Sequence, residues 1–263
     1  MSRHHWRLIV TPPASGAENM ALDEALMERA RTADEWVLRV YSWSSPTISL
    51  GRNQSARDRY DLERVAAAGA SVVRRPTGGR AILHDREITY SVTAPSADAG
   101  DLRESYERIN RVLLAGLAGL GVDALAARTA ARSAGPGMAP GMAPCFDEPA
   151  AGELTVGGRK LAGSAQWRAD GALLQHGSIL IDDDQSLLVA LAREQRAPIP
   201  RPATLAESLG RRPSVDEMAA ALAAAVRELE DPGARELVLD RAIRARASAL
   251  VVRYLDDAWT WRR

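Results

Sequence analysis

Hydrophobic and polar residues alternate along several short segments of the chain, and this period of two predicts β-strands. Turn residues separate the segments, and Gly157-Gly158 and Asp170-Gly171 are typical of hairpins that join neighbouring strands. The predicted strands cover residues 6–10, 37–43, 47–50, 72–73, 81–93, 153–156, 161–167 and 173–181, with a bend at residues 84–85.

Between these strands, apolar residues three or four positions apart predict helices. The predicted helices cover residues 17–31, 61–68 and 105–120, and a mostly helical part follows residue 186, interrupted at residues 198–202. Strands that arrive as hairpins, with helices segregated between them, indicate an α+β fold rather than a wound parallel sheet. We expect mixed or antiparallel sheets flanked by helices in one domain, residues 1–263, with about 186–263 as its helical C-terminal part.

The composition excludes several classes of protein. Hydrophobic residues make up 46% and charged residues 26% of the 263, which is ordinary for a globular protein. Lys+Arg and Asp+Glu both total 34, and this balance argues against a nucleic-acid partner. The single cysteine forms no intramolecular disulfide, and no apolar stretch is long enough for a signal core or a membrane span. We therefore expect a cytoplasmic protein with no membrane partner.

The first candidate for chemistry is the segment 74–85, which reads RRPTGGRAILHD. The paired Gly78 and Gly79 follow a strand, and without a Cβ their backbone N–H groups can approach a ligand closely. Three arginines surround the pair, and the guanidinium fork suits a carboxylate or a phosphate. A hairpin turn with solvated arginines would show the same composition. The segment is therefore either a ligand-contacting loop or a plain turn.

The second candidate is Lys160 within the segment 158–166, GRKLAGSAQ. A lysine that enters a strand of small residues can be partly removed from water, which suits it to proton handling. The small residues 162–165 leave room for another group to lie against the strand. A surface lysine beside a turn is the plain alternative.

The third candidate is Cys145, which lies in a loop rich in Pro and Gly rather than in an apolar run. A thiolate is a strong nucleophile, and a thioester keeps an acyl group activated for attack by an amine. A lone cysteine is nevertheless more often a small buried hydrophobe. His84 and His176 could each act as a base or a substrate contact, and each alone is more often structural.

Together and in this order, the segments resemble the biotin and lipoate protein ligase superfamily, and most of all its octanoyltransferase branch of the LipM type. The resemblance extends from residues 19–23, NMALD, to residues 175–179, QHGSI, and includes the glycine loop, the PCF tripeptide and GRKLAGSAQ. The ordered set is far more specific than any of its members. It implies the catalytic-domain fold of that superfamily and an acyltransferase of lipoate biosynthesis.

The resemblance also implies roles for individual residues. Cys145 matches the cysteine that receives the acyl group as a thioester, and Lys160 matches the lysine that contacts the acyl carbonyl and assists proton transfer. The remaining site residues are expected to bind substrate: Arg74, Gly78, Gly79, Arg80 and His84 in the loop, and Gly163, Ser164, Gln166 and His176 in the strands. No metal or cofactor is implied, since the sequence holds no Cys/His cluster with ligand spacing.

Arg80 favours one branch of the superfamily. Lipoate ligases that use ATP typically have a third glycine there, and an arginine side chain would crowd the space of a nucleotide phosphate. The expected reaction moves octanoyl from octanoyl-acyl carrier protein to Cys145 and then to a lysine of a lipoyl domain. The acceptors would be the glycine cleavage H protein and dehydrogenase E2 subunits, and the enzyme a monomer. The alternatives are an ATP-dependent lipoate–protein ligase, an octanoyl amidotransferase acting between lipoyl domains, and a non-catalytic module that binds an acylated partner.

Overall fold

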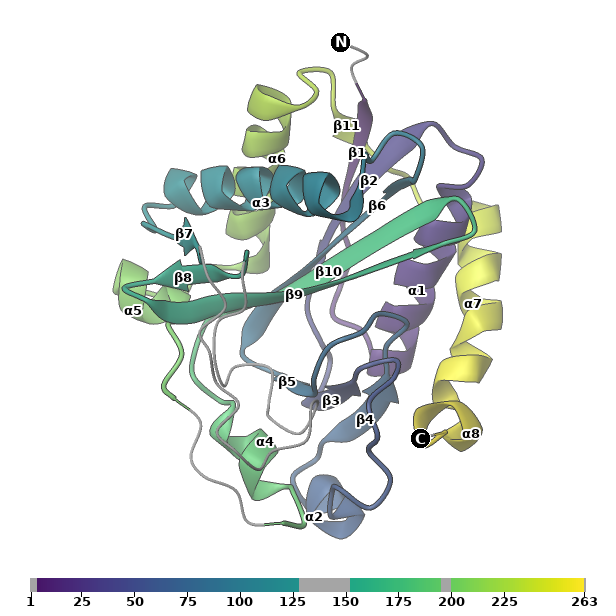
Figure 1. Ribbon diagram of the computed structural model, residues 1–263, viewed down its shortest axis with the longest axis vertical. Helices are drawn as coiled ribbons and strands as arrows, with labels where there is room; N and C mark the ends of the chain where they lie inside the picture. Colours follow the sequence, from purple (N-terminus) through teal and green to yellow (C-terminus); the bar gives the residue numbers. More distant parts are fainter. Residues whose placement is uncertain (1–3, 128–151, 195–199, 263) are drawn as a thin grey trace.

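The computed structural model describes residues 4–127, 152–194 and 200–262, and in this part of the chain a sheet of eight strands lies beside one of three (Figure 1). The large sheet has the order β11–β1–β2–β6–β10–β9–β8–β7, formed by β1 (His5–Val10), β2 (Glu35–Tyr41), β6 (Glu87–Pro95), β7 (Leu125–Ala126), β8 (Leu154–Val156), β9 (Arg159–Ala169), β10 (Ala172–Leu180) and β11 (Arg235–Glu236). The small sheet has the order β4–β3–β5, formed by β3 (Thr47–Leu50), β4 (Ser71–Arg74) and β5 (Ile82–His84).

Strand pairing in both sheets is mixed. In the large sheet β1 runs parallel to β2 and β11, whereas the other neighbours are antiparallel. In the small sheet β3 is parallel to β4 and antiparallel to β5. The predicted α+β class with mixed and antiparallel sheets is confirmed.

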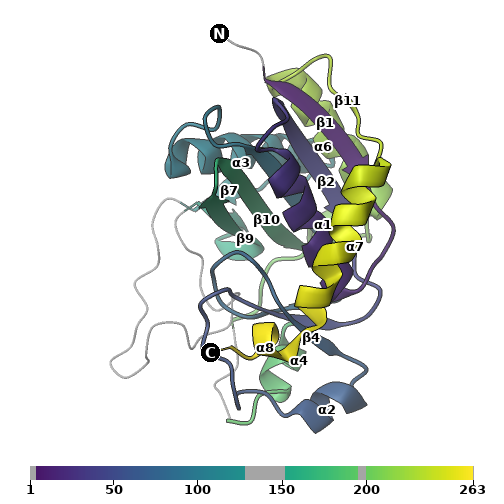
Figure 2. The ribbon, with the colours of Figure 1, turned by 90° about the vertical axis from the view of Figure 1, so that its right-hand side faces the viewer.

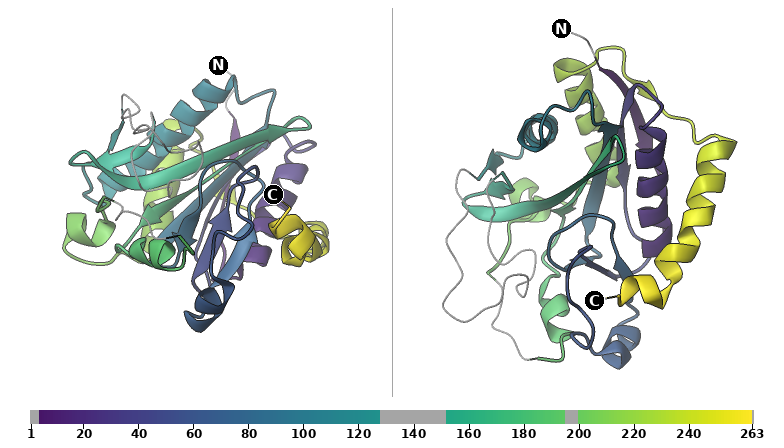
Figure 3. Two further views of the ribbon diagram at one scale, coloured as in Figure 1. Left: turned by 60° about the horizontal axis from the view of Figure 1, so that its bottom comes forward. Right: turned by 45° about the vertical axis from the view of Figure 1, so that its right-hand side comes forward.

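Helices cover both faces of the large sheet (Figure 3). The helices are α1 (Gly16–Arg29), α2 (Leu62–Ala67), α3 (Leu102–Gly119), α4 (Ser186–Ala190), α5 (Leu205–Leu209), α6 (Val215–Leu229), α7 (Arg241–Leu255) and α8 (Asp257–Thr260). The helices α3 and α6 pack with the sheet in the main hydrophobic core, and α1 packs on the opposite face. Figure 2 shows α7 lying along α1, so α1 is covered by the sheet on one side and by α7 on the other.

The hairpins predicted on either side of β9 are both present. Gly157, Gly158, Asp170 and Gly171 all have positive φ, the conformation that tight two-residue turns require. The predicted helix at 105–120 begins earlier, at Leu102, because Asp101 caps it in a reciprocal capping box. The C-terminal part is mostly helical as expected, but it also contributes the short edge strand β11.

No helix in the described ranges combines the length and the apolar composition that crossing a membrane requires. Within those ranges, no cluster of three or more His, Cys, Asp or Glu side chains is arranged to hold a metal ion.

Candidate active site

The loop between β4 and β5, residues 75–81, carries the paired glycines and lies against β9 of the large sheet. Gly79 has φ +93°, and a Cβ built on it would lie 2.7 Å from Arg75 Nη2 and 3.8 Å from the Cβ of Ala165. Only glycine fits such a position without strain. A Cβ built on Gly78 would meet no described atom within 4 Å, so the backbone at Gly78 borders open space. We call residues 75–81 the glycine loop.

Arg75 fills the inside of the glycine loop. Its Nη2 donates to the carbonyl oxygens of Gly78 at 2.8 Å and of Arg80 at 2.7 Å, and its Nε donates to Gly78 at 3.1 Å. Its Nη1 donates to the carbonyl and to Oγ of Ser49, at 2.9 and 3.0 Å. The side chain is 5% exposed, so Arg75 acts as a buried clamp on the loop. The sequence analysis predicted substrate binding by Arg74 and Arg80 rather than a role for Arg75, because a run of arginines does not indicate which side chain points inward.

Arg74 is fully buried and points to a different part of the backbone. It donates to the carbonyl oxygens of Gly51 at 2.6 Å, Gln54 at 2.8 Å and Thr260 at 2.8 Å. These contacts tie the turn after β3 to the C-terminal helix α8. The proposed role of Arg74 in substrate binding stays a prediction. Arg80, at the end of the glycine loop, is partly exposed.

Asp23 on α1 is the centre of a buried polar network that faces the large sheet. Its Oδ1 accepts from Arg39 Nη1 and from Ser91 Oγ, both at 2.7 Å, and its Oδ2 lies 2.9 Å from Tyr41 Oη and 3.1 Å from His176 Nδ1. Burial opposes ionisation, but the Arg39 charge and the surrounding donors hold the pKa of Asp23 below its ordinary value. Asp23 is therefore a carboxylate that accepts four hydrogen bonds.

His176 on β10 links this network to the glycine loop. Its Nδ1 faces Asp23, and its Nε2 is 2.7 Å from Thr77 Oγ1 in the loop. Burial lowers the pKa of His176, against the opposing effect of the Asp23 charge, so the imidazole is neutral. A neutral ring beside a carboxylate carries its proton on Nδ1, which leaves Nε2 to accept from the Thr77 hydroxyl.

His84 on β5 has a similar pair of partners. Its Nε2 is 2.8 Å from Ser49 Oγ and its Nδ1 is 2.8 Å from Glu87 Oε1. The ring stacks on Trp43, with centroids 4.0 Å apart, and Trp43 Nε1 donates to the same Glu87 oxygen at 3.0 Å. The hydroxyl of Thr89 also donates to that oxygen. Hydrogen bonds therefore hold both ring nitrogens of His84, and its partner Ser49 also contacts Arg75 of the glycine loop.

The segment around Lys160 divides between the two faces of β9, because successive strand residues point to opposite sides. Ala165 lies beneath the glycine loop, and Gly163 shares that face. Ser164 and Gln166 face α3 instead: Gln166 Nε2 donates to Ser105 Oγ on that helix at 2.9 Å. Sequence reasoning grouped these residues as one set, whereas the structure brings only part of them to the loop.

On the α3 face, Ser164 Oγ is 2.7 Å from the hydroxyl of Tyr90, which accepts from Gln175 Nε2 at 2.9 Å. Burial raises the pKa of Tyr90 to about 12, so the phenol stays neutral. The contact between Ser164 and Tyr90 spans β10 at Gly177 and depends on the missing side chain there. A Cβ on Gly177 would lie 2.6 Å from Ser164 Oγ and 2.7 Å from both a ring carbon of Tyr90 and the carbonyl oxygen of Gly163.

Lys160 is buried near the start of β9 and forms an ion pair with Glu153. The distance from Nζ to Glu153 Oε1 is 2.6 Å, and the two side chains are 2% and 9% exposed. Lys160 lies opposite Thr155 in the β8–β9 hairpin, and Glu153 immediately precedes β8. Glu153 was not predicted as a site residue. The only sequence signal was an acidic residue on the other side of the hairpin turn.

Cys145 lies outside the described residues, so its predicted relation to Lys160 is not part of this geometry. The described residues on either side of 128–151 do pair with one another. Ala127 N donates to the carbonyl oxygen of Glu153 at 2.8 Å, and Gly152 N donates to that of Ala127 at 2.9 Å. The segment that contains Cys145 is therefore joined to the described chain directly beside the partner of Lys160.

The described residues hold a buried lysine–glutamate pair at the start of β9 and, against the middle of the same strand, a glycine loop that borders open space, with small residues between the two. The profile of the lipoyl protein ligase A/B catalytic domain matches residues 15–227. The chain belongs to this family. Curated relatives include octanoyltransferases LipM, and the chain is 45% identical to that of Symbiobacterium thermophilum over 84% of each chain. It is 40% identical to that of Kyrpidia tusciae, over 98% of this chain and 99% of the other. The resemblance predicted from the ordered motifs is confirmed.

Solved structures agree on the fold. A lipoate–protein ligase A bound with ATP superposes with a TM-score of 0.75 at 24% identity, covering 99% of both chains. The bi-partite lipoate protein ligase of Thermoplasma acidophilum superposes with a TM-score of 0.75 at 23% identity, over 99% of this chain and 97% of that one. The predicted catalytic-domain fold of the superfamily is therefore confirmed.

Proposed function

We propose that this acyltransferase moves an octanoyl group from octanoyl-acyl carrier protein to a lysine of lipoyl-domain proteins through a thioester on Cys145, in lipoate biosynthesis. It would act as a cytoplasmic monomer, with the glycine cleavage H protein and dehydrogenase E2 subunits as acceptors. Octanoyl transfer follows from the LipM relatives, which are 40% and 45% identical to the chain over most of its length. The observation that supports the proposed chemistry is the buried Lys160–Glu153 pair, whose Glu153 directly follows Gly152 and accepts a backbone hydrogen bond from Ala127.

In the first half-reaction the Cys145 thiolate attacks the carbonyl carbon of the donor thioester, and a tetrahedral oxyanion forms. A buried ammonium group is well suited to stabilise that charge, because the surroundings screen it little. Lys160 supplies such a cation, and Glu153 holds it at the start of β9. The oxyanion collapses, the bond to the donor sulfur breaks, and the donor leaves as a thiolate, which takes up the proton that the Cys145 thiol lost on activation.

In the second half-reaction the ε-amine of the acceptor lysine attacks the acyl-enzyme. An amide bond forms, the amine loses a proton, and the Cys145 thiolate is released. Exchange between two thioesters is nearly balanced and amide formation is downhill, so neither half needs ATP. The open space at Gly78, the absence of a side chain at Gly163 and the small side chain of Ala165 offer room for the acyl chain.

The test is the intact mass of the purified protein after incubation with octanoyl-acyl carrier protein in the absence of ATP. We expect a gain of one octanoyl group that hydroxylamine removes and that Cys145→Ala abolishes. Adding an apo lipoyl domain should then discharge the adduct and acylate the domain. In Lys160→Met, with its fold checked by circular dichroism, both steps should slow by at least about a hundredfold, a common effect of losing one oxyanion-stabilising group.

Three other results would each replace the proposal. Modification of the lipoyl domain from free octanoate or lipoate plus ATP, with no adduct, would make the protein a ligase. An adduct formed only from an octanoylated lipoyl domain would make it an amidotransferase. Binding of acylated partners that Cys145→Ala leaves unchanged, with no acylated product, would make it a binding module.

A further inference from the structure

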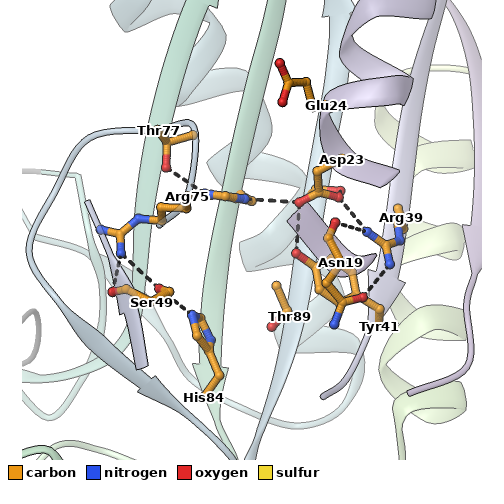
Figure 4. A network of polar contacts seen from close by, with 12 residues as sticks. Asn19, Asp23, Glu24, Arg39, Tyr41, Ser49, Arg75, Thr77, His84 and Thr89 are labelled. Atoms are coloured by element: carbon orange, nitrogen blue, oxygen red, sulfur yellow. Dashed lines mark hydrogen bonds and ion pairs between the residues drawn. The ribbon is translucent and has the colours of Figure 1, made fainter. Parts of the chain in front are cut away.

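Two chains of buried hydrogen bonds end on the glycine loop, and each consists of a carboxylate, an imidazole and a hydroxyl. Figure 4 shows Asp23 and Thr77 of the first chain, and His84 and Ser49 of the second beside Arg75. The first contains Asp23, His176 and Thr77, and the second contains Glu87, His84 and Ser49. All six side chains belong to buried residues. The two carboxylates themselves have no hydrogen bond to the loop among the contacts of the described residues.

The direction of the protons in the first chain is fixed by its ends. The Asp23 carboxylate can only accept, so His176 must donate from Nδ1. The bare Nε2 then accepts the Thr77 hydroxyl proton at 2.7 Å. The carbonyl oxygen of Thr77 in turn accepts from the backbone N–H of Arg52 at 2.7 Å. Thr77, near the start of the glycine loop, is thus held by hydrogen bonds to both its side chain and its backbone carbonyl.

The second chain reaches the loop through Arg75. The Glu87 carboxylate fixes the proton of His84 on Nδ1, so the bare Nε2 accepts from the Ser49 hydroxyl. A lone pair of Ser49 Oγ receives Arg75 Nη1 at 3.0 Å. Together with the Ser49 carbonyl oxygen, which accepts from the same Nη1 at 2.9 Å, this contact sets the rotation of the Arg75 guanidinium, whose Nε and Nη2 donate to the loop.

Arg75 then orients the peptides of the glycine loop. The carbonyl oxygen of Gly78 points to Arg75, which donates to it twice. In a trans peptide the carbonyl and the following N–H point in opposite directions, so the N–H of Gly79 points away from Arg75. The backbone N–H of Gly79 therefore lies on the side of the loop opposite Arg75, next to the open space at Gly78.

We propose that the two chains are a positioning device for the octanoyl-transfer site, in which Asp23 and Glu87 fix the tautomers of His176 and His84 and so hold the glycine loop in its ligand-receiving shape. This inference rests on the proposed function for its kinetic part only. Asp23 and Glu87 act through the imidazoles, and neither needs to contact substrate.

The substitution Asp23→Asn tests the first chain by a change of tautomer. Arg39 cannot accept a hydrogen bond, and it shares one oxygen of Asp23 with the Ser91 hydroxyl. The amide oxygen of the new side chain must therefore face Arg39, which turns its NH2 group towards His176. The ring then has to accept on Nδ1 and carry its proton on Nε2, and the Thr77 hydroxyl loses its acceptor.

Nitrogen-15 spectra of the imidazoles measure the tautomer directly, without any substrate. The chain has only four histidines, so the signals can be assigned with His84→Gln and His176→Gln. We expect both rings in the Nδ1–H form in the wild type and His176 in the Nε2–H form in Asp23→Asn. The backbone amide signals of Gly78 and Gly79 should shift in that variant. The matched control is Tyr41→Phe, which removes another donor to the same Asp23 oxygen and should change neither.

The kinetic arm uses Thr77. Replacement by Val keeps the shape and removes the hydroxyl, whereas replacement by Ser keeps the hydroxyl. We expect kcat for octanoyl transfer to fall about tenfold in Thr77→Val, the effect of one lost hydrogen bond in the transition state, and to stay within about twofold of wild type in Thr77→Ser. A role in stability alone would lower Tm in Thr77→Val without this effect on kcat.

Each outcome decides the inference. An Nε2–H tautomer for His176 in the wild type would overturn it, and so would unchanged loop signals in Asp23→Asn. Wild-type turnover in Thr77→Val would overturn the positioning role and leave octanoyl transfer intact. A wild-type protein that transfers no octanoyl would refute the proposed function instead, and the imidazole and loop signals would still decide whether the two chains shape the loop.

Discussion

The ion pair between Lys160 and Glu153 gives the sharpest quantitative prediction. The two side chains are 2% and 9% exposed and their charged atoms are 2.6 Å apart. Breaking a buried pair by removing one partner typically costs about 3–5 kcal/mol, because the remaining charge loses its ion-pair partner in a poorly solvated place. Glu153→Gln keeps an oxygen that accepts a hydrogen bond from Lys160. We therefore expect the lower end of the range, a loss of about 3 kcal/mol in the free energy of unfolding.

The assay is urea unfolding at neutral pH, with Glu107→Gln as the matched control. Glu107 pairs with Arg103 on the outside of α3, where the two side chains are 54% and 85% exposed. Exposed ion pairs on a helix contribute little because water screens them, so the control should unfold close to wild type. The double variant Glu153→Gln with Lys160→Met should regain most of the loss, because no buried charge remains.

A loss below about 1 kcal/mol in Glu153→Gln, the range of solvent-exposed pairs, would contradict this prediction. The prediction would also fail if the double variant were as unstable as the sum of the two single variants, since the two effects would then be independent. Either result would mean that Lys160 does not depend on Glu153 for compensation of its charge.

Three further predictions follow from single positions. Gly177→Ala should lower Tm strongly in thermal unfolding, because its Cβ would lie within 2.7 Å of backbone and ring atoms, whereas Gly78→Ala should leave Tm unchanged and lower octanoyl transfer. Burial raises the pKa of Asp184 from 3.8 to about 6, so the folded state keeps a proton that the unfolded state releases, and stability is lost as pH rises through that window; Asp184→Asn should flatten Tm against pH there. Arg39→Met should cost about 3–5 kcal/mol in urea unfolding, because it leaves the fully buried Asp23 carboxylate without its cation, and a loss under 1 kcal/mol would contradict this.

The strands and hairpins of the central sheet could be predicted because their signals are local. Alternation at residues 37–43 predicted the strand observed as β2, and the turn pairs on either side of residues 161–167 predicted the hairpins that contain β9 and β10. The two-residue strands β7 and β11 have no such signal, because two residues cannot display a period. They form because the chain passes along the free edge of a neighbouring strand and pairs with it.

The candidate site could be predicted only in part, because its polar partners are set by tertiary structure. The motif segments predicted roles for Lys160 and residues of the glycine loop. Asp23 and Arg75 lie within those segments without a predicted role of their own, and Glu153 lies outside them. Asp23 lies on a helix that is buried on two sides, and such a helix lacks the single apolar stripe that separates exposed from buried positions. One sign was present: polar residues of α1 occupy positions that a one-sided helix would fill with apolar ones.

The polar interior beneath the glycine loop is costly, and its arrangement indicates what it does. A buried carboxylate that accepts four hydrogen bonds is tolerated, but well-packed apolar residues in place of buried ion pairs often stabilise a protein by 1–4 kcal/mol. Asp23 and Glu87 therefore contribute little net stability for the number of groups they order. Their contribution is orientation. Each carboxylate fixes the position of the proton on an imidazole ring, and that ring orients a hydroxyl that leads to the glycine loop. A loop with glycines at its centre is flexible by composition, and two rigid anchors beneath it reduce the conformations that an acyl substrate would otherwise have to select.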